Sequence, residues 1–299
     1  SAMDCARHLI QNRGARRREV NVIAGSGMWF MTRDNIYPPG PQRYFRGTVN
    51  ADLFLTMAKL FDGHNDADVM EQLKRRGLTH TVWGVGGNCR VALLSLDEKA
   101  ELRAGVDHVF HGHLVDVDGT RMTLRQGNVL QEHNVPAGSY FINCTTHLRS
   151  GPHVPVLQDS GLVCAPQFAC GLTGMSAYYI THAWFSEQLS AVAPELFRLR
   201  LEVEPKLRFV THLALMTAAN MTMLTRRLPP KLIREYEGDF NRWYPLYRRI
   251  PMIARVTANR RMLLHKAERL LKIRFSDSPD PIATTPSVQA LGASDRIYA

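Results

Sequence analysis

The chain has 299 residues, of which 45% are hydrophobic, so it can bury the core of one large domain or of two ordinary ones. No stretch approaches the roughly 18 uncharged apolar residues of a membrane-spanning helix, and the first residues lack the charged and then apolar layout of a secretory signal. We therefore expect a globular, cytoplasmic protein. The net charge of +10 comes from one stretch, Arg198 to Arg274, in which 18 Lys and Arg stand against 6 Asp and Glu.

The first ten residues, Ser1 to Ile10, predict a helix, because apolar side chains recur at helical spacing until Gly14 ends the pattern. A β-branched run, Val20 to Ala24, then predicts a short buried strand. Helix, glycine turn and strand together are typical of the second half of a βαβ unit. We expect the first strand of that unit and its glycine-rich turn to precede Ser1.

The Pro- and Gly-rich stretch 33–47 predicts a loop too broken for regular structure. Two amphipathic helices are predicted next, over Asn50 to Phe61 and over 66–76, and Gly77 ends the second. The segment 89–106 is expected to start extended and to become helical.

Three short strands are predicted over 107–118, 121–127 and 139–145, each separated from the next by turn residues such as Asp118 and Gly119. This spacing indicates an antiparallel meander. The first 145 residues are therefore predicted to form an α/β unit with a small antiparallel insert.

An irregular, Pro-bearing stretch, 147–166, is the best candidate for a domain boundary, and a strongly apolar helix is predicted after Gly171. Beyond Pro194 the pattern is helical and basic, with interruptions at prolines, and the last residues have the composition of a tail. The predicted regions are an α/β unit at 1–145, a connecting segment at 146–193, a mostly helical basic region at 194–275 and a tail at 276–299.

Three other motifs are predicted to have structural roles and no catalytic or ligand-binding role. The five cysteines are scattered, without a CxxC pair, and are expected to be reduced and mostly buried. Among three clustered histidines only His111 and His113 share a strand face, and no carboxylate or thiol completes a ligand set, so no metal site is predicted. The glycine-rich stretch 83–88 lacks the Lys and Ser or Thr of a phosphate-binding loop and is predicted to be a turn.

The basic helical region suggests three kinds of surface. It can be a solvated or intramolecular face, a peripheral membrane or protein contact, or a nucleic-acid contact. Aromatic residues interleave with the charge over 235–251, which favours contact with some partner. Because no nucleic-acid motif accompanies the charge, we expect no nucleic-acid partner.

The order of these segments resembles that of flavin-dependent oxidoreductases, with the closest likeness to flavin-containing and N-hydroxylating monooxygenases. The likeness covers residues 1–186 and lies in the segments SAMDCARHL, VNVIAGSGMWFMTRDNIYPPG, GVDHVFHGHLVDVDGTRMTLRQGN, AGSYFINCT and CAPQFACGLTGMSAYYITHAWF. In that family a nicotinamide unit is inserted into an FAD unit. The resemblance implies a partial Rossmann-like unit, the cofactors FAD and NAD(P)H, and a chain that is the C-terminal part of such an enzyme.

The resemblance also assigns cofactor-binding residues. Ser1, Ala2, Met3 and Asp4 would follow the glycines of the second dinucleotide fingerprint, and Thr145 would end the strand that returns the chain to the FAD unit. The residues that would meet the flavin are Leu172, Thr173, Gly174, Met175 and Ser176.

Two features depart from the family pattern. The FAD fingerprint and the glycines of the second fingerprint are absent from the sequence. The family members that use NADPH tend to carry an Arg just past the second strand, where this chain has AGSG and Arg33 is the nearest candidate. The choice between NADH and NADPH therefore stays open.

The resemblance implies that hydride passes from NAD(P)H to FAD and then to oxygen or another acceptor acting on a small-molecule substrate. No acid–base residue is assigned. The alternative is a non-catalytic module that binds a nucleotide or a partner and uses the basic helical region as its interaction surface.

Overall fold

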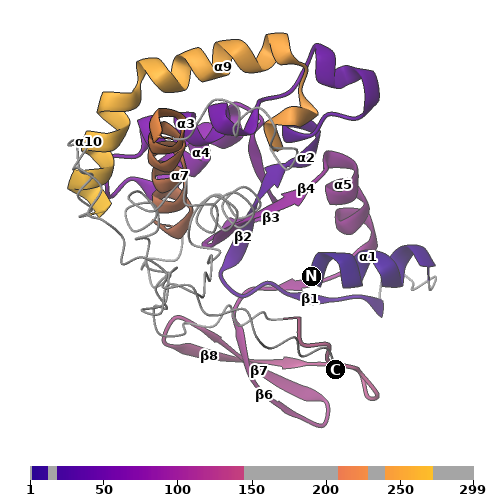
Figure 1. Cartoon of the computed structure of the whole chain (residues 1–299). Helices are drawn as coiled ribbons and strands as arrows, with labels where there is room; N and C mark the ends of the chain where they lie inside the picture. The colour runs from indigo at the N-terminus through magenta and orange to yellow at the C-terminus, as the bar shows by residue number, and fades with distance from the viewer. Residues whose placement is uncertain (1, 13–18, 145–207, 228–239, 272–299) are drawn as a thin grey trace, which may run out of the picture.

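The computed structural model describes residues 2–12, 19–144, 208–227 and 240–271 (Figure 1). The elements before residue 145 are α1 (Ala2–Asn12), β1 (Val22–Ile23), β2 (Gly27–Thr32), α2 (Arg33–Ile36), η2 (Gly40–Tyr44), α3 (Asn50–Leu60), α4 (Asp66–Arg75), β3 (Thr79–Gly86), β4 (Cys89–Leu94), α5 (Leu96–Gly105), β5 (Val109–Phe110), β6 (His113–Asp118), β7 (Arg121–Gln126) and β8 (Val129–Asn134). The later elements are α7 (Arg208–Arg227), η4 (Phe240–Trp243), α9 (Leu246–Ala258) and α10 (Arg260–Leu271). Helices and mixed sheets make this an α/β fold, as predicted.

A three-stranded sheet of order β3-β2-β4 separates two hydrophobic cores. Strand β2 pairs antiparallel with β3 and parallel with β4. Successive side chains of a strand point to opposite faces. Trp29 and Met31 accordingly face one core and Phe30 faces the other.

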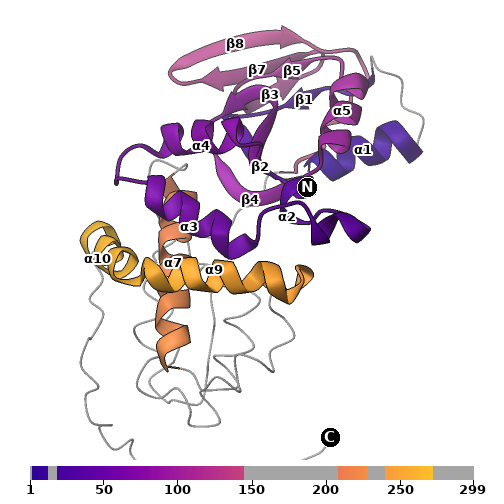
Figure 2. The same cartoon turned by 90° about the horizontal axis from the view of Figure 1, so that it is seen from above.

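The larger core, here called the helical core, is built from β2, α3, α4, α7, α9 and α10. Figure 2 shows α3, α7, α9 and α10 on one side of β4. One charged side chain, Asp66, is buried there; its carboxylate accepts from Thr211 Oγ1 at 2.5 Å and from Arg208 Nε at 3.2 Å. These bonds join the start of α4 to the start of α7.

The smaller core, here called the α1–α5 core, lies on the other side of the sheet. It contains Ala6 of α1, Val22 of β1 and Leu102 of α5, together with Phe30. Strands β1 and β5 pair in parallel, with Val22 opposite Val109. The predicted helix at 1–10 and the predicted strand at 20–24 are therefore confirmed, although the strand is shorter than expected.

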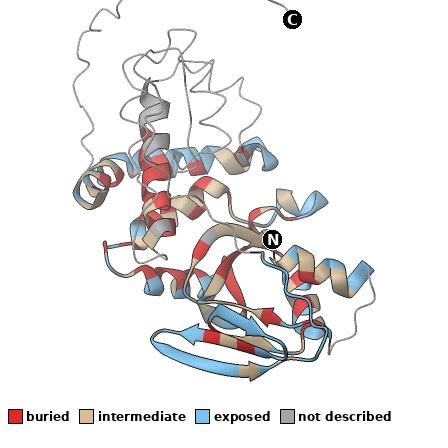
Figure 3. Cartoon of the chain, turned by 90° about the horizontal axis from the view of Figure 1, so that it is seen from below, coloured by how far each residue is buried: buried red, intermediate tan, exposed pale blue. Residues whose placement is uncertain are grey.

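The meander is real, but its third strand was wrongly predicted. It consists of β6, β7 and β8 in antiparallel register, and only Met122 and Leu124 of these strands are buried (Figure 3). The segment 139–144 forms no strand, and Thr145 lies outside the described residues. Aromatic and β-branched composition does not make a strand where no neighbouring strand supplies hydrogen bonds.

Other sequence predictions need correction. Strands β2 and β3 were not predicted, and the glycine-rich stretch 83–88 belongs to β3 up to Gly86 rather than being wholly a turn. The predicted loop 33–47 contains α2 and η2. Pro251 does not interrupt the helical region, because α9 runs through it.

The loop 33–47 is held by side chains from η4 and from the start of α9. Its backbone carbonyls accept from Trp243 Nε1, Tyr247 Oη and Arg248. The Tyr244 hydroxyl lies 2.8 Å from the carbonyl of Ile36 and 3.2 Å from that of Thr48. Burial raises the pKa of Tyr244 to about 12. Gly47 has φ +87°, and a Cβ there would collide with the Tyr244 hydroxyl, so this position requires glycine.

In the part of the chain that the structure describes, no helix is long and apolar enough to cross a membrane. The domain boundaries predicted at 145, 193 and 275 all lie outside the described residues.

Candidate functional site

The predicted site residues that the structure describes occupy two places. Ala2, Met3 and Asp4 form the first turn of α1, and Arg33 begins α2. The remaining predicted residues, Ser1, Thr145, Leu172, Thr173, Gly174, Met175 and Ser176, lie outside the described residues.

The first turn of α1 lies beside the end of the segment 139–144. Cys5 lies beside Cys144, and burial together with the neighbouring Cys5 thiol raises the pKa of Cys144. The N–H groups of a first helical turn have no partner within the helix, and the helix dipole adds positive charge there. The turn is therefore a candidate for holding an anion, and the carboxylate of Asp4 in the same turn offsets part of its positive charge.

Arg33 belongs to an ion-pair cluster that joins α1, α2 and α5. Glu98 Oε1 lies 2.6 Å from Arg7 Nη1 and 2.7 Å from Arg33 Nη1. Arg33 Nη2 also donates to the Leu93 carbonyl at 3.3 Å, and Arg7 Nε donates to Glu101 Oε2 at 2.9 Å. Two arginines thus face two glutamates, and the cluster carries no net charge.

Glu98 is the centre of this cluster and is nearly buried. Burial alone would raise its pKa, but the Ser95 N–H and the guanidiniums of Arg33 and Arg7 together hold the pKa of Glu98 below its ordinary value. Arg33 would have to share Glu98 in order to bind a 2′-phosphate. The geometry therefore favours neither NADPH nor NADH.

The role of Glu98 was not predicted, although a signal for it exists in the sequence. Ser95 and Glu98 form a capping box at the start of α5, in which each side chain accepts from the backbone N–H of the other. The S-x-x-E spacing can be recognised in the sequence. The two arginines that converge on Glu98 come from distant segments, so their contact with it cannot be predicted from the sequence.

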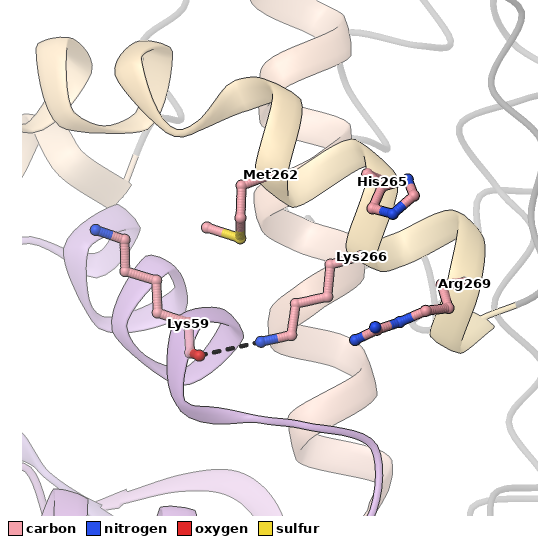
Figure 4. A pocket seen from close by; sticks show the side chains of 5 residues that line it. All are labelled: Lys59, Met262, His265, Lys266 and Arg269. Atoms are coloured by element: carbon pink, nitrogen blue, oxygen red, sulfur yellow. Dashed lines mark hydrogen bonds between the residues drawn. The ribbon is translucent and has the colours of Figure 1, made fainter.

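A second candidate is a shallow basic hollow of about 410 Å³ between α3 and α10. Figure 4 shows its lining side chains, Lys59, Met262, His265, Lys266 and Arg269. Lys266 Nζ donates to the carbonyls of Ala58 at 2.7 Å and Lys59 at 3.0 Å, so it caps the end of α3. The hollow attracts anions, but its lining contains neither a carboxylate nor a thiol.

Within the described ranges, no three His, Cys, Asp or Glu side chains gather as a metal site requires. Cys5, Cys89 and Cys144 are free thiols, and only Cys89 is fully buried.

Comparison of the chain with protein-family models, with curated proteins and with solved structures finds no match.

Proposed function

We propose that the chain is the C-terminal portion of an FAD- and NAD(P)H-dependent oxidoreductase of the monooxygenase type, and that α1, β1 and β5 belong to its nicotinamide-binding unit. The observation that carries the proposal is the contact between Cys5 and Cys144. It brings the first turn of α1 to the segment that, by the resemblance, ends the nicotinamide unit.

Two further observations support the proposal. Strands β1 and β5 are parallel, and α1 packs against α5 beside them. A three-stranded meander follows β5 directly, at the place where the resemblance requires it. Helix α1, parallel strands and meander occur here in the order that such a unit uses.

The described residues fit the pyrophosphate of a dinucleotide at one point. Ala2 and Met3 are partly exposed at the start of α1, and the short side chain of Ala2 allows close approach of a phosphate to the backbone. When bound, the nicotinamide and the flavin supply the hydride chemistry. The chain would orient the dinucleotide through first-turn N–H groups, and no acid–base role is assigned to any side chain.

The cysteine pattern is the ground on which we propose that the enzyme works in the reducing cytoplasm. The five cysteines are scattered along the sequence without a CxxC pair.

The test is calorimetric titration of the full chain with NADH and with NADPH. Ala2→Glu places a negative charge at the start of α1. This charge interacts favourably with the helix dipole but repels a pyrophosphate. We expect the dissociation constant to rise about tenfold, an effect of about 1.4 kcal/mol. His8→Glu, two turns along α1 and exposed, is the matched control and should bind as the wild type does.

Equal affinity of the wild type and the Ala2→Glu variant, or no heat from either nucleotide, would contradict the nicotinamide assignment. The part of the proposal that concerns FAD is tested by translating the coding sequence upstream of Ser1. A strand, GxGxxG and helix unit encoded there supports the proposal, and a stop codon there counts against it.

A further inference from the structure

Helix α9 presents apolar side chains on two neighbouring faces, roughly 100° apart around its axis. Met252 and Val256 are buried in the helical core. Leu246, Ile250 and Ile253 are 60%, 55% and 50% exposed, and their spacing of four and then three residues places them on one outward face. The helix therefore packs through one apolar face and leaves a second one in water (Figure 3).

Aromatic side chains extend this outward face. Tyr247 is 58% exposed, and its hydroxyl donates to the carbonyl of Tyr44, which brings the end of η2 to the start of α9. Phe45, the next residue, is 84% exposed. We call this group the α9 surface; its members are Tyr44, Phe45, Leu246, Tyr247, Ile250 and Ile253. Contiguous exposed apolar groups mark a contact surface, whereas scattered ones do not.

The charge around the α9 surface is mostly positive, although Arg255 of α9 is paired with Asp52. Residues 240–271 contain eight Arg and Lys and a single acidic residue, Glu268. Arg260 and Arg261 are exposed at the start of α10, just after α9 ends. The Arg43 guanidinium lies 5.3 Å from the ring centres of both Tyr44 and Trp243, so further positive charge borders η2.

We propose that the α9 surface docks on a bilayer that contains anionic lipids, with α9 lying in the plane of the interface. An apolar stripe bordered by arginines is the composition of helices that insert about 5–10 Å into the headgroup region. The basic residues attract anionic headgroups, and the exposed Leu, Ile and Phe side chains enter the acyl boundary. This inference does not depend on the proposed oxidoreductase function.

The test is sedimentation of the full chain with phosphatidylcholine vesicles, with and without phosphatidylserine. We expect binding to the mixed vesicles alone, and a loss of binding between about 0.1 M and about 1 M salt. The double variant Ile250→Gln/Ile253→Gln should bind about tenfold more weakly, because two half-exposed side chains no longer enter the apolar layer.

A matched control lies at the far end of the molecule. Leu130 of β8 is 62% exposed, and Figure 1 shows β8 at the bottom of the molecule and α9 at the top. Leu130→Gln removes a similar exposed side chain and should bind vesicles as the wild type does. Circular dichroism of each variant checks that α9 still forms.

The charge contribution has its own variant. Arg260→Gln/Arg261→Gln should weaken binding by about fivefold per charge and reduce the salt dependence. Equal sedimentation with both kinds of vesicle, or equal binding of the Ile250→Gln/Ile253→Gln variant and the wild type, overturns the proposal. A dimer in light scattering that this variant abolishes would assign the α9 surface to a second copy of the chain and also overturns it.

Discussion

The helical core and the α1–α5 core lie against the same three-stranded sheet, but they are closed in different ways. The helical core is closed by helices that come from beyond residue 207, and among its described residues Asp66 is the buried charged group, beside buried polar side chains such as Thr211 and Thr217. The α1–α5 core has fewer buried residues, and its margin is held by the ion pairs of Glu98. We expect the helical core to supply most of the free energy of unfolding. The α1–α5 core carries the candidate nucleotide site, and its stability depends on the ion pairs at its margin. Ligand sites are commonly drawn from the less stable parts of a fold.

The largest expected effect is on the helical core. Asp66→Ala removes the acceptor of Thr211 and leaves the partly buried Arg208 without its carboxylate. Breaking a buried ion pair in this way should lower the free energy of unfolding by about 3 kcal/mol, measured by urea denaturation. The comparison variant is Asp52→Asn. The partner of Asp52, Arg255, is half exposed, so this substitution should lower the free energy of unfolding by about 1 kcal/mol or less. Equal losses would mean that burial of the pair does not matter.

An intermediate effect is expected from pH on the α1–α5 side of the sheet. His80 of β3 lies beside Phe30, and burial, with Lys99 nearby, lowers its pKa to about 4. Because the folded pKa lies below the unfolded value of about 6.5, protonation favours unfolding, and stability is lost as pH falls from about 6.5 towards 4. Between pH 7 and pH 5 the loss from this residue should be about 2 kcal/mol.

The variant that isolates this effect is His80→Gln. Burial also lowers the pKa of His212 in the helical core, so acid destabilisation of the wild type has two sources. In His80→Gln the loss between pH 7 and pH 5 should shrink by most of that amount. An unchanged pH profile in urea denaturation would show that His80 is free to ionise in the folded state.

The smallest expected effect comes from the ion pairs of the α1–α5 core. Glu98→Gln keeps the shape of the side chain but removes the charge that Arg7 and Arg33 share, and should cost about 1.5 kcal/mol at low salt. The cost should fall at about 1 M salt, where surface charges are screened. Glu101→Gln, at a more exposed site, should cost less than about 1 kcal/mol. A Glu98→Gln cost that is unaffected by salt would remove the contrast between the two cores.

The helices before residue 80 could be predicted because their information is local. In α3 and α4 the apolar residues recur at helical spacing, and α4 ends before Gly77, which has φ +69°. The parts that failed depend on partners far along the chain. Strand β2 reads GMWFMT and is buried on both faces, so it shows no alternation, and its Trp29 indole donates to the carbonyl of Gly86 in β3.

The candidate site was predictable only in part, for the same reason. The first turn of α1 follows from helical periodicity, but its contact with Cys144 joins residues at opposite ends of the unit. Arg33 was singled out for a phosphate and instead lies against Glu98. An arginine in a sequence shows its charge but not which carboxylate the fold brings to it.

The hydrogen bonds that hold the loop 33–47 also set an order of events during synthesis. Trp243 follows its acceptor Pro38 by 205 residues. At translation rates of about 5–20 residues per second, the loop leaves the ribosome about 10–40 s before the side chains that bind it exist. During that interval water must satisfy its carbonyls. The loop beside the sheet is therefore expected to become ordered only after α9 has been made, as one of the last steps in the folding of a segment that was among the first to be synthesised.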